Sequence, residues 1–309
     1  MDKQLPLRTR LAVIVASGAS LAMVAVAGPG PTAAASALAS ASVRVTATVE
    51  APVWSHNPAL PDGPTHWAGL TPDWAACGGD GDQSPIVIND GRRVALPPLQ
   101  VDYPRVPLIV ENTGHVVEVP QPADAVGTLR FGTAVYRLTQ WHVHAPSEHV
   151  VNGHRADLEI HLVHQDAQGS TAVLAIFADI ARPGPGADGR GGTAGLLRRT
   201  LRAAPETAGE ETDTGTKASP VTLLPSDARR SGRPGAVVGS YLTYGGSLTT
   251  PPCTTGVRWF VLPTLVRVDA GTVDRLHELV AGFPGYGGYP DNNRPVQPIG
   301  TRTVQRRAG

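Results

Sequence analysis

Two stretches of the sequence alternate as β-strands do: Leu138-Thr-Gln-Trp-His-Val-His-Ala145 and Leu158-Glu-Ile-His-Leu-Val-His164. Side chains of a β-strand alternate between its two faces. In the first stretch one face therefore collects Gln140, His142 and His144, and the other face collects Trp141, Val143 and Ala145. In the second stretch the two sets are Glu159, His161 and Val163 against Leu158, Ile160 and Leu162. Residues 146–156, with Gly153 available for a turn, predict a hairpin connection between the two strands.

Pairing of these strands would bring His161 beside His142 and His144. Three imidazoles on a rigid sheet leave a tetrahedral metal with one open position, which is typical of a catalytic zinc site. The motif His-x-His alone is a weak signal, but Gln140 and Glu159 each precede a candidate ligand by two residues on the same face. An amide oxygen or carboxylate so placed can accept the spare ring N–H of the ligand. His149 and His154 have no role in this interpretation, and His164, on the opposite face from His161, is expected to be structural.

The surrounding sequence indicates a mostly β protein. Short β-rich runs separated by turn residues recur at 86–88, 108–110, 115–119, 134–138, 241–244 and 257–262. With 35 Gly and 29 Pro, the chain is punctuated too often for a helical bundle. Helices are expected only at 196–203 and 274–281, a break at 182–192, and a mobile polar loop at 205–219.

The N-terminus has the pattern of an export signal. Basic residues up to Arg10 precede an apolar run from Leu11 to small residues ending at Ala27. A membrane anchor or a buried helix is the alternative, although the run is short for a span and no later segment would cross a bilayer. We therefore predict a signal peptide at 1–27, a flexible lead-in at 28–52, one domain at 53–304 and a tail at 305–309.

The charge balance and the number of cysteines limit which kinds of function are possible. The 309 residues include 26 Lys+Arg and 26 Asp+Glu, and removal of the signal leaves a net charge of −2, which disfavours a nucleic-acid partner. Cys77 and Cys253 are the only cysteines. An oxidising compartment favours a disulfide between them, and two buried free thiols are the alternative.

Four motifs in this order resemble the α-class carbonic anhydrases over residues 53–304. They are Gln83-Ser-Pro85, the histidine pattern at 140–161, Tyr244-Gly-Gly-Ser-Leu-Thr-Thr-Pro-Pro-Cys253 and Asn292-Asn-Arg-Pro-Val-Gln-Pro298. The resemblance implies a single domain with a central twisted, mainly antiparallel sheet of about ten strands and a few short surface helices. It also implies that Cys77 and Cys253 form the disulfide found in secreted members.

The same resemblance implies the activity and the roles of individual residues. The expected reaction is reversible hydration of carbon dioxide to bicarbonate and a proton, by attack of a hydroxide bound to Zn²⁺. Zinc-bound water ionises near neutral pH, an effect for which carbonic anhydrases are themselves the standard example. Anionic and sulfonamide-type inhibitors are expected to bind at the metal. The implied residues are the zinc ligands His142, His144 and His161; their supports Gln140, Glu159 and Asn292; the orienting pair Thr249 and Glu148; the proton shuttle His115; and the substrate pocket Val163, Val173, Leu248, Thr250, Val257 and Trp259.

Some positions depart from the family pattern. The Tyr expected after His66-Trp67 is absent, and Thr113 and Glu118 stand where many members carry amides. We therefore expect the water path to the shuttle to be arranged differently.

Three other function classes remain open at this point. They are a binding protein on the same fold, a zinc hydrolase acting mainly on esters, and a purely structural zinc domain. Zinc content measured together with carbon dioxide hydration would separate them. The sequence leaves open the oligomeric state and whether the exported protein stays at the cell envelope.

Overall fold

The computed structural model describes residues 52–79, 81–182, 191–228 and 236–307. The predicted signal peptide and nearly all of the lead-in lie outside the described residues, as does most of the predicted break at 182–192. The helices are α1 (Trp67–Leu70), α2 (Gly192–Ala203) and α3 (Ala270–Ala281), with 3₁₀ turns at Pro72–Gly78 and Pro220–Leu223. The strands are β1 (Val87–Ile88), β2 (Arg92–Val94), β3 (Leu99–Asp102), β4 (Val106–Asn112), β5 (Val117–Pro120), β6 (Thr128–Phe131), β7 (Ala134–His144), β8 (Val150–Val151), β9 (Leu158–Gln165), β10 (Thr171–Ile180), β11 (Glu211–Ala218), β12 (Ala236–Val238), β13 (Leu242–Ser247), β14 (Thr255–Val268) and β15 (Gln305–Arg307).

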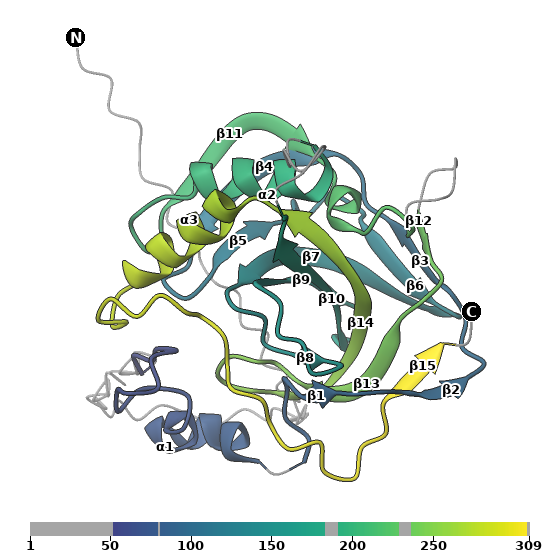
Figure 1. Cartoon of the computed structure of the whole chain (residues 1–309), viewed down its shortest axis with the longest axis horizontal. Coiled ribbons are helices and arrows are strands. Elements are labelled where there is room, and N and C mark those ends of the chain that lie inside the picture. Colours follow the sequence, from purple (N-terminus) through teal and green to yellow (C-terminus); the bar gives the residue numbers. More distant parts are fainter. Residues whose placement is uncertain (1–51, 80, 183–190, 229–235, 308–309) are drawn as a thin grey trace, which may run out of the picture. The chain divides into compact units, whose positions relative to one another are not determined.

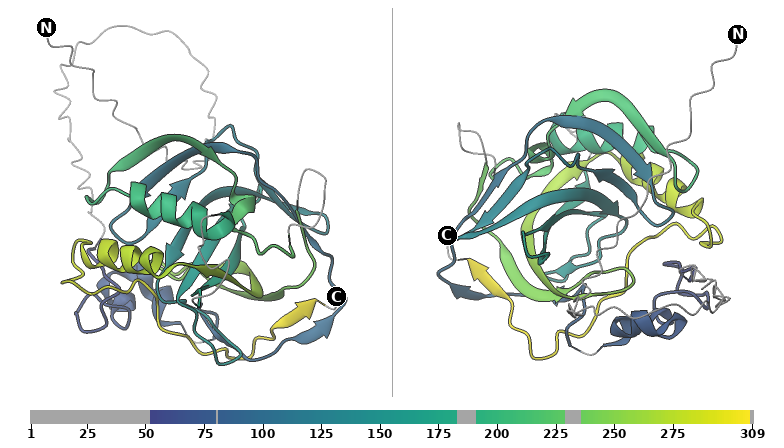
Figure 2. Two further views of the ribbon diagram at one scale, coloured as in Figure 1. Left: turned by 45° about the horizontal axis from the view of Figure 1, so that its top comes forward. Right: turned by 180° about the vertical axis from the view of Figure 1, so that it is seen from behind.

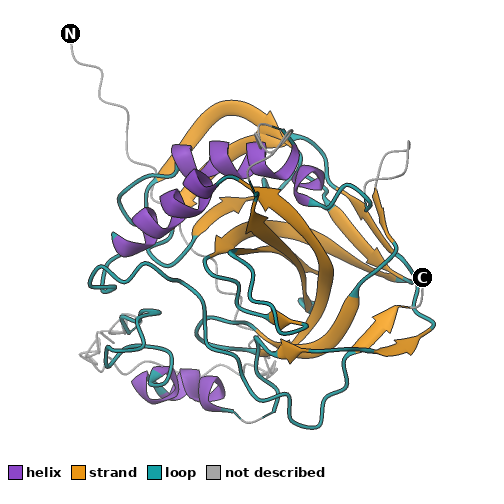
Figure 3. Ribbon diagram, in the orientation of Figure 1, coloured by secondary structure: helices purple, strands orange, loops and turns teal. Residues whose placement is uncertain are grey.

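One large sheet dominates the described part of the chain and confirms the mostly β prediction (Figures 1 and 3). Its strand order is β11-β4-β5-β7-β9-β10-β14-β13-β15-β2, and β6, β3 and β12 branch from β7, which makes 13 strands among the described residues. Most pairs are antiparallel, but β10 pairs with β14 and β15 with β2 in parallel. The strand number exceeds the prediction because several strands have only three or four residues, too few to give a clear alternation.

The hairpin of β7 and β9 lies at the centre of this sheet and has the predicted faces. Trp141 and Val143 of β7 and Ile160 of β9 are buried in the larger apolar core, and His142 and His161 point to the opposite side. Leu197 of α2 and Leu276 of α3 belong to the same core, so these helices cover the sheet on the face away from the histidines. Figure 2 shows both helices against the strongly curved sheet.

The two helices begin earlier than the sequence predicted. Helix α2 starts at Gly192 rather than at residue 196, and α3 starts at Ala270 rather than at residue 274. Asp269 caps α3, because its side chain accepts a hydrogen bond from the backbone N–H of Thr272 at 3.0 Å. No helix among the described residues is long and apolar enough to cross a membrane.

The prediction of a mobile loop at 205–219 was wrong over most of its length. Strand β11 pairs antiparallel with β4 at the edge of the sheet. An edge strand with one exposed face can be polar, and its β-branched Thr212, Thr214 and Thr216 alternate as a strand requires. The hydroxyl of Thr214 donates to the carbonyl of Leu108 on β4 at 2.9 Å.

The C-terminal tail predicted at 305–309 also needs correction. Gln305–Arg307 form β15, which hydrogen-bonds to β13 on one side and to β2 on the other. These residues are therefore part of the sheet. A three-residue run of polar side chains carries no strand signal by itself, so only its neighbours make it a strand.

A disulfide joins Cys77 and Cys253 across 176 residues, with Cα atoms 5.0 Å apart. Both cysteines pack with Trp67 and Trp74 in a small apolar cluster. The bridge fastens the segment before β1 to the turn between β13 and β14.

Candidate active site

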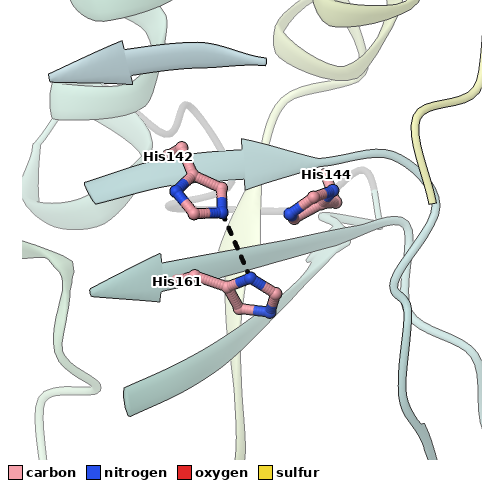
Figure 4. A group of neighbouring side chains, drawn as sticks. All are labelled: His142, His144 and His161. Atoms are coloured by element: carbon pink, nitrogen blue, oxygen red, sulfur yellow. Dashed lines mark hydrogen bonds between the residues drawn. The ribbon is translucent and has the colours of Figure 1, made fainter. Parts of the chain in front are cut away.

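Three histidines from two adjacent strands meet on the face of the sheet away from the large core. His142 and His144 come from β7, and His161 comes from β9, where it is the register partner of His142. Their ring centroids lie 4.7–5.2 Å apart. One ring nitrogen of each lies within 4.8 Å of the others. Figure 4 shows the three rings side by side on the two strands. A bulge in β7 between Leu138 and Gln140 sets the register that places them opposite each other.

In each of the three rings, one nitrogen lies within hydrogen-bond distance of an acceptor oxygen. Nδ1 of His142 lies 2.8 Å from Oε1 of Gln140. Nδ1 of His144 lies 2.7 Å from the backbone carbonyl oxygen of Asn292, and Nε2 of His161 lies 2.7 Å from Oε1 of Glu159. Where a ring is neutral, its acceptor takes the ring N–H and the other nitrogen keeps its lone pair. Those nitrogens face one another. Burial alone would lower the pKa of His161, but Glu159 and Glu148 raise it.

The inward-facing nitrogens form a convergent donor set. Nδ1 of His161 lies 3.3 Å from Nε2 of His142. Nε2 of His144 is buried and has no hydrogen-bond partner in the described part of the chain. Burial and the neighbouring imidazoles lower the pKa of His142 and of His144, which favours their neutral, ligating forms.

Glu159 supports His161 from within a fully buried polar chain. Its Oε1 also lies 2.7 Å from Nδ1 of His149, and its Oε2 accepts the backbone N–H groups of Glu148 and His149 at 2.8 Å. Burial alone would raise the pKa of Glu159, but His149 and His161 hold it well below its usual value. The oxygen–nitrogen distances from Glu159 to His149 and His161 are those of hydrogen bonds and are longer than zinc–ligand bonds. These three residues therefore form a hydrogen-bonded chain.

The same chain continues through residues to which the sequence interpretation assigned no individual role, although Ser84 and Tyr244 stand in two of the family motifs. Nε2 of His149 lies 2.6 Å from the hydroxyl of Tyr244, which lies 2.9 Å from Oγ of Ser84. His149 was given no role in the sequence interpretation, yet it is buried and fixes Glu159. No sequence spacing signals this, because Ser84, His149 and Tyr244 come from three distant parts of the chain.

Glu148 lies directly beside the histidines. Its Oε1 accepts the backbone N–H of Arg294 at 2.9 Å. Its Oε2 lies 3.7 Å from Nε2 of His144 and 3.8 Å from Nε2 of His161. Oε2 is buried and has no hydrogen-bond partner among the described residues. A free carboxylate oxygen therefore faces the histidine cluster.

A cavity of about 410 Å³ opens over His142 and His161. Five of the six residues predicted for the substrate pocket line it, together with Thr249, whereas Val257 lies behind it in the apolar cluster that includes Trp259. The sequence interpretation missed Thr139, Gln165 and Thr171 of its wall. The wall consists of Thr139, Gln140, His142, His161, Val163, Gln165, Thr171, Val173, Leu248, Thr249, Thr250 and Trp259.

His115, the predicted proton shuttle, does not line this cavity. Its ring is half-buried and stacks on Trp54, with ring centroids 3.7 Å apart and an angle of 10° between the planes. Burial lowers the pKa of His115 to about 4. In this arrangement the ring is a weak base, because burial against Trp54 removes water from it.

Two further titratable groups near the site were not assigned a role from the sequence. His56 is fully buried, with Nδ1 2.6 Å from the hydroxyl of Tyr286 and its ring 6.4 Å from that of His144. Glu118 on β5 is the register partner of His142. Burial, and then the charge of Glu111, raise the pKa of Glu118 to about 7.

Comparisons with known proteins agree with this geometry. The sequence profile of the eukaryotic-type carbonic anhydrases matches residues 62–308. The carbonic anhydrase of Neisseria gonorrhoeae is 32% identical over 244 residues, which are 79% of this chain and 84% of that protein. Dioscorin DB3L of Dioscorea polystachya is 32% identical over 247 residues, 79% of this chain and 82% of that protein.

Solved structures share the fold. The α-carbonic anhydrase of Thermovibrio ammonificans, in complex with the inhibitor sulfanilamide, superposes with a TM-score of 0.68 at 33% identity, covering 82% of this chain and 98% of that one. The α-carbonic anhydrase of Photobacterium profundum gives a TM-score of 0.67 at 28% identity, covering 82% of this chain and all of that one. The chain therefore belongs to the eukaryotic-type carbonic anhydrase family, whose activity is the hydration of carbon dioxide.

Proposed function

We propose that the chain hydrates carbon dioxide reversibly with a zinc ion held by His142, His144 and His161. One observation carries the proposal: three imidazole nitrogens converge, and each ring is oriented by an acceptor on its other nitrogen. This is the donor set and the outer support expected of a catalytic zinc site with one open position. The buried, unpartnered Nε2 of His144 and Oε2 of Glu148 fit a cation between them and the cavity.

Bound zinc would supply a Lewis acid that lowers the pKa of water, as established for carbonic anhydrases in general. The three neutral imidazoles leave the charge of the metal undiminished. Glu159, which binds His161, adds a negative charge behind one ligand and fixes its tautomer. Gln140 and the Asn292 carbonyl do the same for the other two rings without a net charge.

Thr249 and Glu148 would orient the reacting water. In this proposal the Thr249 hydroxyl donates to Oε2 of Glu148, the carboxylate oxygen that lacks a partner. The Thr249 oxygen then has only its acceptor function left for the water, which fixes the direction of a lone pair. Thr249 lies in the cavity wall beside Thr250, as this role requires.

The apolar part of the cavity would receive carbon dioxide. Val163, Val173, Leu248 and Trp259 form a wall next to His161. An uncharged linear molecule needs no ion pair there, and the wall keeps competing water out. Val257 supports Trp259 from behind. The adjacent Thr249 backbone N–H would contact bicarbonate or an anionic inhibitor, and binding of sulfonamides is inferred from the Thermovibrio complex.

His115 is the proposed carrier of the proton to solvent. Its Nδ1 has no hydrogen-bond partner among the described residues, and the residue lies on the turn before β5; both support the role. The stacking on Trp54 implies that its ring must leave this position, or remain a weak base, when it transfers protons. We also propose that the protein is exported, since its disulfide suits an oxidising compartment.

Zinc content and carbon dioxide hydration measured on the same preparation test this function. We expect one zinc per chain and hydration activity in the wild type, with both lost in His144→Ala. His154→Ala is the matched control, because this histidine is 53% exposed and pairs with Asp179 outside the site. Stoichiometric zinc without hydration activity, or full activity in His144→Ala, would contradict the proposal and favour a binding or structural role.

A further inference from the structure

Three glutamates form a continuous row that ends at the candidate metal site. The register pairs Glu211 of β11 with Glu111 of β4, and Glu111 with Glu118 of β5. Glu118 in turn pairs with His142 of β7, and His142 with His161 of β9. Figure 1 shows β11, β4, β5 and β7 following one another in the sheet. The row therefore crosses the sheet from its edge to the histidines.

All three carboxylates belong to the face of the sheet that carries the histidines. Directly paired residues of adjacent strands point to the same face. The residues flanking the row, Val110 on β4 and Val117 and Val119 on β5, are buried in the large core on the other face. Glu118 is half-buried and Glu211 is exposed, so the row runs from solvent towards the cavity.

Positive charge near the histidines comes from the buried Arg294, which interacts with Glu148, and not from the wall of the cavity. Among the described residues that line the cavity, none is a lysine or an arginine. The charged neighbour that affects Glu118 most is Glu111, another carboxylate. Adjacent strands lie about 4.8 Å apart, so the backbones of Glu118, Glu111 and Glu211 stand one, two and three strand spacings from that of His142.

We infer that Glu118, supported by Glu111, makes the site discriminate against anions while admitting neutral carbon dioxide. This inference rests on the proposed function, because it assumes that anions bind at the metal held by the histidines. The row is not a binding site itself. Its effect is electrostatic: it opposes anionic inhibitors and favours departure of bicarbonate, and it leaves an uncharged substrate unaffected.

Distance and screening predict a graded effect. Removal of one charge at about two strand spacings from a bound anion changes its affinity roughly three- to tenfold at low salt. We expect Glu118→Gln to lower the inhibition constant of thiocyanate by that factor. Glu111→Gln should lower it roughly two- to threefold, and Glu211→Gln by less than about twofold. Glu118→Asp keeps the charge and should behave like the wild type.

The experiment uses the zinc-loaded full chain at alkaline pH, where the carboxylates are ionised, with thiocyanate as the anion and phenol as a neutral inhibitor. Thiocyanate binding is measured by calorimetry as well as by inhibition, and the KM for bicarbonate is compared with that for carbon dioxide. Glu278→Gln is the control, since this exposed residue lies on α3, which covers the opposite face. Added sodium sulfate should shrink the difference between Glu118→Gln and the wild type.

The outcomes separate the inference from the function on which it rests. Equal thiocyanate affinity in the wild type and Glu118→Gln, equal changes for thiocyanate and phenol, or a larger effect at Glu211 than at Glu118 would overturn the inference alone. A wild type without zinc or hydration activity would overturn the proposed function and the inference with it. If Glu118→Gln does not fold, Glu111→Gln decides, and an unchanged thiocyanate affinity there rejects the inference.

Discussion

The backbone carbonyl oxygen of Asn292 lies 2.7 Å from Nδ1 of His144, a residue 148 positions earlier in the chain. The Asn292 side chain fixes this carbonyl, because its Oδ1 accepts the Ala145 N–H at 2.9 Å and its Nδ2 donates to the Val143 carbonyl at 3.2 Å. A loop without regular secondary structure is thereby fastened to the end of β7.

Asn292→Ala should weaken zinc binding without removing a ligand. The alanine keeps the carbonyl but loses the side-chain hydrogen bonds that position it, so we expect roughly tenfold weaker zinc affinity. Competition with a chelator of known affinity measures it. Asn293→Ala is the control, because the neighbouring side chain is not buried. Equal zinc affinities in the two variants would show that the carbonyl position does not matter.

Glu159→Gln should weaken zinc binding more than Gln140→Ala does. The first change removes a buried charge that binds His161 and His149, and the second removes a neutral acceptor at a half-buried site. We expect a loss of roughly 10–100-fold for Glu159→Gln and less than tenfold for Gln140→Ala. The rate of zinc release to a chelator gives the comparison, and the reverse order would contradict the assigned supports.

These residues also show how far the sequence alone reaches. Gln140 and Glu159 were predictable because each lies two residues from its histidine on the same strand face, a local relationship. Asn292 was expected only through the family resemblance, and the stack of Trp54 on His115 was not predicted, because these contacts join distant segments. Strand β11 was missed because an edge strand lacks the apolar alternation that identifies a central one.

Loss of the disulfide between Cys77 and Cys253 should destabilise the protein strongly. The bridge closes a loop across 176 residues, for which the chain-entropy model gives roughly 3–5 kcal/mol of unfolding free energy. Denaturant unfolding of the Cys77→Ser/Cys253→Ser double variant against the oxidised wild type measures this loss. A reductant should not change the free energy of unfolding of the double variant. It should lower that of the wild type to the value of the double variant. A stability unchanged by reduction would contradict the entropic role.

His164 should make the fold sensitive to acid. It is fully buried, with Nε2 2.8 Å from the hydroxyl of Tyr103, and burial lowers its pKa from 6.5 to about 4. Between these values the unfolded chain binds a proton that the folded chain does not, so stability is complete above pH 6.5 and is lost as the pH falls. The full difference is about 3 kcal/mol.

The test is denaturant unfolding of the wild type and His164→Leu across this pH range. The variant starts less stable at neutral pH but has lost the titrating group, so the gap between the two proteins should shrink by about 3 kcal/mol towards pH 4. No change in the gap is expected above neutral pH. A gap that stays constant from pH 7 to pH 4 would contradict a lowered pKa at His164.

His115 should limit turnover through its contact with Trp54. With its pKa lowered to about 4, the ring is a poor proton acceptor at neutral pH, so added imidazole buffer should accelerate the wild type at saturating carbon dioxide. Trp54→Ala removes the stacked ring and returns water to His115, which should raise its pKa towards 6.5 and increase kcat in weak buffer.

His115→Ala should lower kcat roughly two- to tenfold in weak buffer with kcat/KM unchanged, and imidazole should restore kcat. The double variant Trp54→Ala/His115→Ala is the control, because any gain from Trp54→Ala must vanish when the histidine is absent. Unchanged kcat in His115→Ala, together with no response to imidazole, would show that the proton leaves by another route.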